Sequence, residues 1–173
     1  MLELRLAKVV MVGSLALFAF IVTFDNITDY GSNFTFVQHV LSMDTTFPGN
    51  ALMYRAITTP ALWHLAYAGI IAAEGTTFLT LATATVQLVR NLRAPGVQFD
   101  ASKRFAFVGI ALGFLIWFFG FMVVGGEWFA MWQSSQWNGQ PAAFRFYAAL
   151  LGVAIFVNQH DGDISGRTFD GTA

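Results

Sequence analysis

The sequence predicts an all-α fold, a bundle of four transmembrane helices with a structured extracytoplasmic cap formed by two loops. Composition is the first reason, because 56% of the 173 residues are hydrophobic and only 11% are charged, unlike a soluble domain. The second reason is that four segments approach the length needed to cross a bilayer. The third is the placement of the basic residues, which gives the direction of the crossings.

Four apolar segments approach the length of a spanning helix. A hydrocarbon core about 30 Å thick requires about 20 mostly apolar residues. The expected spans are residues 6–24, 61–89, 105–124 and 142–157. The fourth is the shortest, but it carries no charge from Phe146 to Val157, which favours four spans over three. These spans form one domain over residues 1–157, followed by a flexible cytoplasmic tail over residues 158–173.

The basic residues divide unequally between the two sides of this bundle. Seven share the side that holds both termini: Arg5, Lys8, Arg90, Arg93, Lys103, Arg104 and Arg167. Only Arg55 and Arg145 fall on the other side. Because cytoplasmic loops carry the excess of Lys and Arg, both termini are expected to be cytoplasmic. Residues 25–60 and 125–141 are then the two outer loops.

The two outer loops are rich in polar and aromatic residues, which suits a folded cap better than a neutral linker. In the longer loop, Phe34, Val37 and Leu41 recur at helical spacing and predict a short amphipathic helix. The candidate residues for an interaction at this cap are Asp25, Asp29, His39, Asp44, Arg55, Glu127, Trp128, Trp132, Trp137 and Arg145. Contact with a protein or anchoring at the interface is favoured over a lipid or quinone pocket at the tryptophans.

Glu74 lies near the middle of the second span. An ionised carboxylate there costs about 3 kcal/mol on insertion scales, so the side chain is expected to be buried, protonated or partnered. Helical geometry places Tyr67 near the same face, and the two residues form a candidate intramembrane polar site. Use as a hydrogen-bonding group at a helix interface is favoured, and a proton or ion site is the alternative.

Several kinds of chemistry lack the residues that they require. The chain has no cysteine, which excludes thiolate metal sites, iron–sulfur clusters and cysteine catalysis. The outer acidic residues and His39 show no recognised metal-ligand spacing, and His39 and His64 have no haem attachment motif. No Ser/His/Asp ordering, phosphate-binding glycine loop or basic nucleic-acid surface is present. We therefore expect no metal, no cofactor, no nucleic-acid partner and no enzymatic activity.

The loops also carry specific strings of sequence. These are Asp25-Asn-Ile-Thr-Asp-Tyr-Gly-Ser-Asn-Phe34, Val40-Leu-Ser-Met-Asp-Thr-Thr-Phe47, Gly126-Glu-Trp-Phe-Ala-Met-Trp-Gln-Ser134 and Trp137-Asn-Gly139. In these strings the chain resembles a bacterial family described as predicted small integral membrane proteins, a domain of unknown function. The likeness runs from the first span to the end of the fourth. It implies a multi-pass protein of the bacterial inner membrane, and it supplies no catalytic residue.

Three functions remain open at this level. The favoured one is a noncatalytic accessory or scaffold protein, whose partners are the lipid bilayer and other membrane protein subunits or a second copy. The second is a small proton-coupled or ion transporter that uses Glu74, although no inverted repeat is evident. The third is a lipid- or quinone-binding subunit of a larger enzyme.

Overall fold

All regular secondary structure is helical, with no strand, over residues 1–164, which the computed structural model describes. Four helices in this range are long and apolar enough to cross a membrane. They are Leu2–Thr28, Pro60–Arg90, Gly96–Trp128 and Gln140–Val157. The predicted all-α bundle of four crossings is therefore confirmed. Each helix contains one predicted span and extends beyond it, because helical backbone continues through the first polar residues at its ends.

The third crossing differs from the others because it is built from three successive helical segments. The elements in chain order are α1 (Leu2–Thr28), α2 (Tyr30–Ser42), η1 (Met53–Arg55), α3 (Pro60–Arg90), α4 (Gly96–Ser102), α5 (Arg104–Phe114), the π-helix η2 (Leu115–Trp128), η3 (Met131–Gln133) and α6 (Gln140–Val157). Proline stands in the first turn of both α3 and α6, where its missing N–H has no helical partner to lose.

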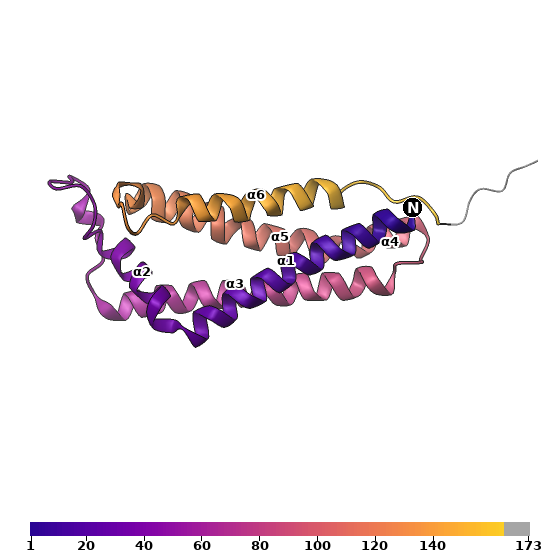
Figure 1. Cartoon of the computed structure of the whole chain (residues 1–173), viewed down its shortest axis with the longest axis horizontal. Helices are drawn as coiled ribbons and strands as arrows, with labels where there is room; N and C mark the ends of the chain where they lie inside the picture. Colours follow the sequence, from indigo (N-terminus) through magenta and orange to yellow (C-terminus); the bar gives the residue numbers. More distant parts are fainter. Residues whose placement is uncertain (165–173) are drawn as a thin grey trace, which may run out of the picture.

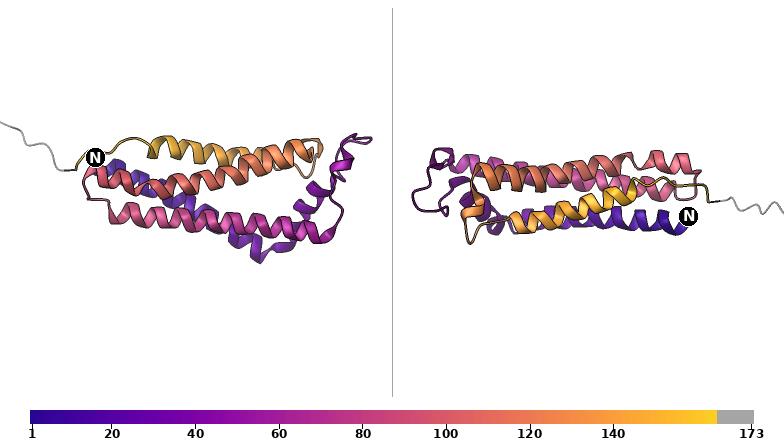
Figure 2. Two further views of the ribbon diagram at one scale, coloured as in Figure 1. Left: turned by 180° about the vertical axis from the view of Figure 1, so that it is seen from behind. Right: turned by 90° about the horizontal axis from the view of Figure 1, so that it is seen from above.

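The crossings pack as an antiparallel bundle, with α1 along α3 and α6 along the third crossing (Figure 1). Figure 2 shows the same arrangement from behind and from above. The N terminus, α4 and the segment after α6 lie at one end, which we call the terminal end. The opposite end, the cap end, carries α2 and the loops on either side of η1 and η3.

The helix α3 and the third crossing approach each other more closely in the half of the bundle nearer the terminal end than in the half nearer the cap. Val12 of α1 and Leu88 of α3 are fully buried there, within one apolar cluster shared by all four crossings. On α5, Gly109 packs so tightly against α3 that an added Cβ would lie 2.6 Å from the side chain of Leu81. Close approach of this kind is typical of helix interfaces in membranes, where packing drives association.

Buried charged side chains close the terminal end. The Nζ atoms of Lys8 and Lys103 each lie 2.5 Å from Oδ2 of Asp161, and these three side chains are at most 4% exposed. Lys103 also lies 2.5 Å from Oδ1 of Asp100. Arg5 is fully buried beside them and donates to the main-chain oxygens of the loop before α4. We call Arg5, Lys8, Asp100, Lys103 and Asp161 the terminal clasp.

The terminal clasp changes the interpretation of the segment after α6. Residues 158–163 of the predicted tail contact α1 and the third crossing in the structure. Gln159 accepts hydrogen bonds from both clasp lysines through its main-chain oxygen, and Gly162 accepts one from Arg5. The acidic residues of this segment look solvated in sequence, but Asp161 neutralises cations that are buried. Residues 165–173 of the predicted tail lie outside the described residues.

Candidate functional site

The predicted pair Glu74 and Tyr67 is brought together through a third residue, Asn26. Asn26 Nδ2 donates to Oε2 of Glu74 at 2.7 Å, and the Tyr67 hydroxyl donates to the main-chain oxygen of Asn26 at 3.0 Å. All three side chains are buried where the end of α1 packs on α3. We call these three residues the polar cluster. The hydrogen bond from Asn26 satisfies the Glu74 carboxyl group, which lies about 21 Å along α3 from Pro60.

Asn26 is the member of the polar cluster that sequence reasoning missed, although a signal was available. It follows Ala19 by seven residues and Val12 by fourteen, and both are fully buried on α1. A seven-residue repeat keeps residues on one face of a helix, so Asn26 falls on the buried face. A polar side chain at such a position requires a partner, and Glu74 is the group within reach.

Aromatic rings continue from the polar cluster toward the cap end. The ring of Tyr67 packs against that of Tyr30, with centroids 4.6 Å apart. The Tyr30 hydroxyl lies 2.8 Å from Nδ1 of His64, whose ring stacks on Phe34 at 4.2 Å. These contacts join the start of α2 to the first turns of α3, so α2 is fixed to the bundle next to the polar cluster.

The two predicted loops meet at the cap end and pack on one another. Thr45 donates to Ser134 Oγ at 2.9 Å, and the main-chain N–H of Phe47 donates to Gln133 Oε1 at 3.0 Å. Phe47 also packs edge-on against Trp132, with centroids 5.7 Å apart. We call residues 30–59 and 128–139 together the cap.

Beneath these polar contacts lies a small apolar core of the cap. It contains Met43, Phe129, Ala130 and Met131, each at most 6% exposed. Met43 and Ala130 both adopt left-handed backbone, with φ of 55° and 51°, at the turn that opens each loop. Such a conformation is unfavourable for residues other than glycine and persists where packing imposes it. The cap is therefore a folded unit.

Six of the ten predicted cap residues make contacts within the cap. His39 lies 2.8 Å from Asp44 and stacks on Trp137 at 4.6 Å. The guanidinium of Arg55 covers the ring of Trp128 at 4.5 Å and donates to its main-chain oxygen at 3.2 Å. Trp132 packs against the other loop, as described above.

The other four predicted residues stay apart from this arrangement: Asp25, Asp29, Glu127 and Arg145 are exposed. Asp29 accepts a hydrogen bond from Ser32 at 2.9 Å. No ion pair joins Glu127 to Arg145 in residues 1–164. Within the same range, no group of three histidine or acidic side chains is placed to hold a metal ion.

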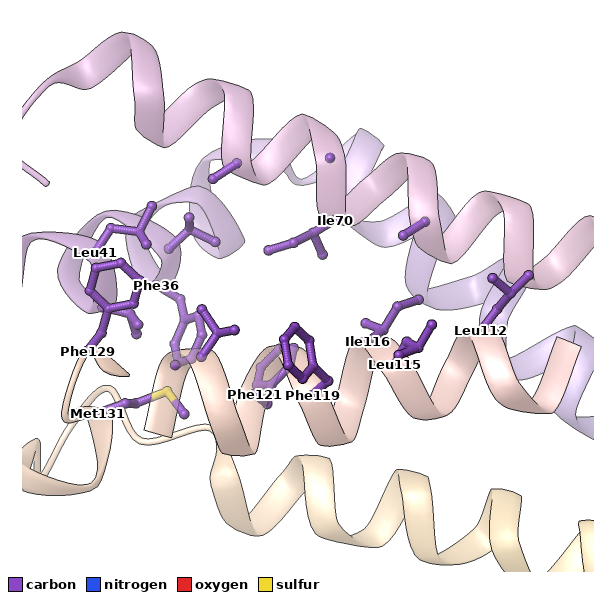
Figure 3. A pocket seen from close by; sticks show the side chains of 18 of the residues that line it. Phe36, Leu41, Ile70, Leu112, Leu115, Ile116, Phe119, Phe121, Phe129 and Met131 are labelled. Carbon is purple, nitrogen blue, oxygen red and sulfur yellow. The ribbon is translucent and has the colours of Figure 1, made fainter. Parts of the chain in front are cut away.

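A lateral cleft of about 640 Å³ lies between α3 and η2 in the half of the bundle nearer the cap (Figure 3). Ile70 of α3 projects into it from one wall, and Ile116 and Phe119 project from the other. Phe36 of α2 and Met131 of the cap close its end. We use the name lateral cleft for this cavity throughout.

The lateral cleft exists because one of its walls carries small side chains. Ala66, Gly69 and Ala73 lie on the face of α3 that lines it, and they are too short to reach η2. Nothing lies within 4 Å of the position where a Cβ on Gly69 would stand. The spacing of these three residues is visible in the sequence, but it also fits helix packing, and the cavity was not predicted.

Comparison with known proteins adds one finding. Residues 4–160 match the family described as "Predicted small integral membrane protein (DUF2165)", and the chain belongs to this family. The resemblance carried by the loop strings is therefore confirmed. No curated protein and no solved structure gives a significant match. An integral membrane protein sits in a lipid bilayer, so the apolar faces of the four crossings face hydrocarbon.

Proposed function

We propose that this family member is a noncatalytic accessory protein of the bacterial inner membrane, and that its cap binds a second membrane protein outside the cytoplasm. The observation that carries the proposal is the cap itself. Two loops far apart in sequence form one packed unit, and this unit leaves large aromatic side chains exposed. Tyr54 is 76% exposed, Phe47 is 55%, and Trp128 and Trp132 are about half exposed.

The distribution of basic residues supports an outer location for the cap. Six of those in residues 1–164 lie at the terminal end, namely Arg5, Lys8, Arg90, Arg93, Lys103 and Arg104. The cap end holds Arg55 and Arg145. The rule that sets orientation counts Lys and Arg rather than net charge, so the ion pairs of Lys8 and Lys103 in the terminal clasp do not weaken it.

The surface of the cap has the chemistry of a protein-binding site. Trp, Tyr and Arg are the residues that most often dominate binding energy, and the guanidinium of Arg55 contacts the rings of both Tyr54 and Trp128. Hydrogen bonds between the loops hold these side chains in place before binding, which lowers the entropy lost on association. A preformed aromatic surface of this kind suits a partner better than it suits a reaction.

Charge indicates what the partner presents. Asp25, Asp29, Asp44 and Glu127 lie at the cap end, against Arg55 and Arg145, so acidic groups exceed basic ones by two. This excess disfavours anionic lipid headgroups and favours a basic protein surface. The partner is therefore a membrane protein with basic residues at the outer interface.

The test is a quantitative comparison of proteins that copurify with the full chain in mild detergent. Trp132→Ala and Tyr54→Ala remove exposed rings of the cap, and Phe107→Ala is the control because it removes a 36% exposed ring of α5 outside the cap. We expect a protein with a basic outer surface to be lost from both cap variants and kept by Phe107→Ala. Identical sets of copurifying proteins in all four samples would contradict the proposal.

Within this proposal the role of Glu74 is structural. Its hydrogen bond to Asn26 joins α1 to α3, which is what an interface residue requires. The transport hypothesis uses the same carboxyl as a proton or ion site, and a measurement of flux separates the two, as described in the Discussion.

A further inference from the structure

The lateral cleft is a built cavity in a part of the molecule that the proposed cap function does not use. Its volume of about 640 Å³ falls within the range of about 300–1,000 Å³ typical of sites for small ligands. It is closed at the cap end by Phe36, Phe129 and Met131 of the cap, and at the opposite end by Leu112 of α5. Residues on its rim are exposed, including Gly69, Leu115 and Phe119. The lateral cleft therefore opens sideways.

The sideways opening faces the bilayer. α3 and η2 belong to two of the four membrane crossings, and the rim residues lie on their exposed faces. The cavity is thus continuous with the surface of the protein that contacts lipid. Leaving it empty would cost dispersion contacts along its whole lining, so whatever is present at that depth fills it. At that depth in a bilayer, the available material is hydrocarbon.

The lining of the lateral cleft favours a hydrocarbon chain that carries no polar group. Among the residues that line the lateral cleft, Thr76 supplies the one hydroxyl, and its Oγ1 already donates to the main-chain oxygen of Ala72 at 2.8 Å. No charged or amide side chain belongs to the lining. A quinone ring would bring carbonyl groups that gain no hydrogen bond there, and an unpaired buried acceptor is unfavourable. An aliphatic chain meets only apolar partners.

The wall formed by η2 is itself unusual. It is a π-helix of 14 residues, whereas most π-helical segments are single turns that occur at functional sites. Leu115, Ile116 and Phe119 of this helix line the lateral cleft opposite the short side chains of α3. Bulky residues on one wall and small residues on the other leave a slot between the helices.

From volume, opening and lining together, we propose that the lateral cleft binds an acyl chain of a membrane phospholipid, which enters sideways from the bilayer. The phospholipid is bound by its tail, and its headgroup stays at the membrane surface. This inference is independent of the partner proposed for the cap, since the exposed aromatic residues of the cap do not line the lateral cleft and either proposal can fail alone.

The test uses the full chain in liposomes that contain a phospholipid with a photoactivatable group on its acyl chain. After irradiation, labelled peptides are mapped by mass spectrometry. Gly69→Leu places an isobutyl group in the lateral cleft, and Gly152→Leu is the matched control, because both are helical glycines with open space at the Cβ position. Both changes bring the same gain in helix propensity.

We expect strong labelling of Ile116, which is buried in the wall of the lateral cleft, in the wild type and in Gly152→Leu. In Gly69→Leu it should fall about tenfold or more, the scale on which extra methylene groups discriminate in an apolar pocket. Thr76→Leu narrows the rim of the same cleft and should act in the same direction, which guards against a folding defect peculiar to one variant.

Three results would overturn the proposal. The first is labelling of Ile116 that is equal in Gly69→Leu and Gly152→Leu. The second is a crosslink from the residues that line the lateral cleft to a second copy of the chain, which would make the lateral cleft a protein interface. The third is loss of phospholipid labelling when a small fraction of an isoprenoid quinone is added, which would make the occupant a quinone tail.

Discussion

The two halves of this bundle are stabilised in different ways. At the terminal end, the clasp holds α1, the third crossing and residues 158–163 together through buried ion pairs, and Gly109 brings α5 against Leu81 of α3. In the half nearer the cap, α3 and η2 separate and leave the lateral cleft. There the chain is held by hydrogen bonds between the loops, aromatic contacts and the polar cluster.

This difference indicates which half can accommodate another molecule. A buried charge without its partner is strongly unfavourable, so the terminal clasp has one arrangement and resists separation. Apolar walls lose little when one hydrocarbon neighbour replaces another, so the half nearer the cap tolerates lipid between its helices. The bundle is thus closed where its charges are buried and open where its lining is apolar.

The largest effect is expected at the terminal clasp. Asp161→Asn leaves Lys8 and Lys103 buried side by side without their shared carboxylate. Breaking a buried ion pair by removing one partner costs about 3–5 kcal/mol. Thermal unfolding in detergent should show a large loss of stability, whereas Glu3→Gln, which changes an 87% exposed carboxylate, should show almost none. Equal melting temperatures for the two variants would contradict the role given to the clasp.

The next effect concerns the polar cluster. Asn26→Leu removes the donor to Glu74 and leaves a buried carboxyl group without it. An unsatisfied buried group of this kind costs about 1–3 kcal/mol, and the loss of stability should appear in the same unfolding assay. The comparison variant is Ser14→Ala, whose exposed hydroxyl bonds only to its own helix at Val10. A loss no greater than that of Ser14→Ala would remove the polar cluster as a stabilising contact.

A smaller effect is expected for Glu74→Gln, which keeps an oxygen that can accept from Asn26. The helix interface should survive, and proton flux into liposomes should equal that of the wild type. A flux that is present in the wild type and absent in Glu74→Gln would favour the transport hypothesis and contradict the structural part given to Glu74.

The smallest effect is expected within the cap. Thr45→Val removes one hydroxyl–hydroxyl bond between the loops, worth about 1 kcal/mol. Hydrogen exchange of the main-chain N–H groups in residues 129–139 should become faster, while exchange in α5 is unchanged. If the loops pack independently, exchange will be the same in both proteins, and the cap is then not one unit.

Much of the architecture could be predicted from the sequence because a bilayer imposes length and apolarity on each crossing. The spacing of Phe34, Val37 and Leu41 correctly indicated the helix α2. Helical geometry placed Tyr67 near the face of Glu74, but Asn26, which contacts both residues, was missed.

The features that escaped prediction depend on contacts between distant segments. The terminal clasp joins Lys8 to Asp161, and nothing in the local pattern around Asp161 distinguishes it from a solvated acidic residue. The lateral cleft exists because the short side chains on one face of α3 do not reach η2. Small residues in the sequence alone do not distinguish a cavity from close helix packing. The terminal clasp and the lateral cleft can be recognised only when the positions of the helices in three dimensions are known.

The most direct test of a closed terminal end and an open half nearer the cap is the amount of phospholipid kept by the purified protein. After exhaustive exchange into detergent, native mass spectrometry counts the lipids bound to each chain. We expect a bound phospholipid on the wild type and on Gly152→Leu, and none on Gly69→Leu. The same retention in all three proteins would show that the lateral cleft does not hold a lipid tail.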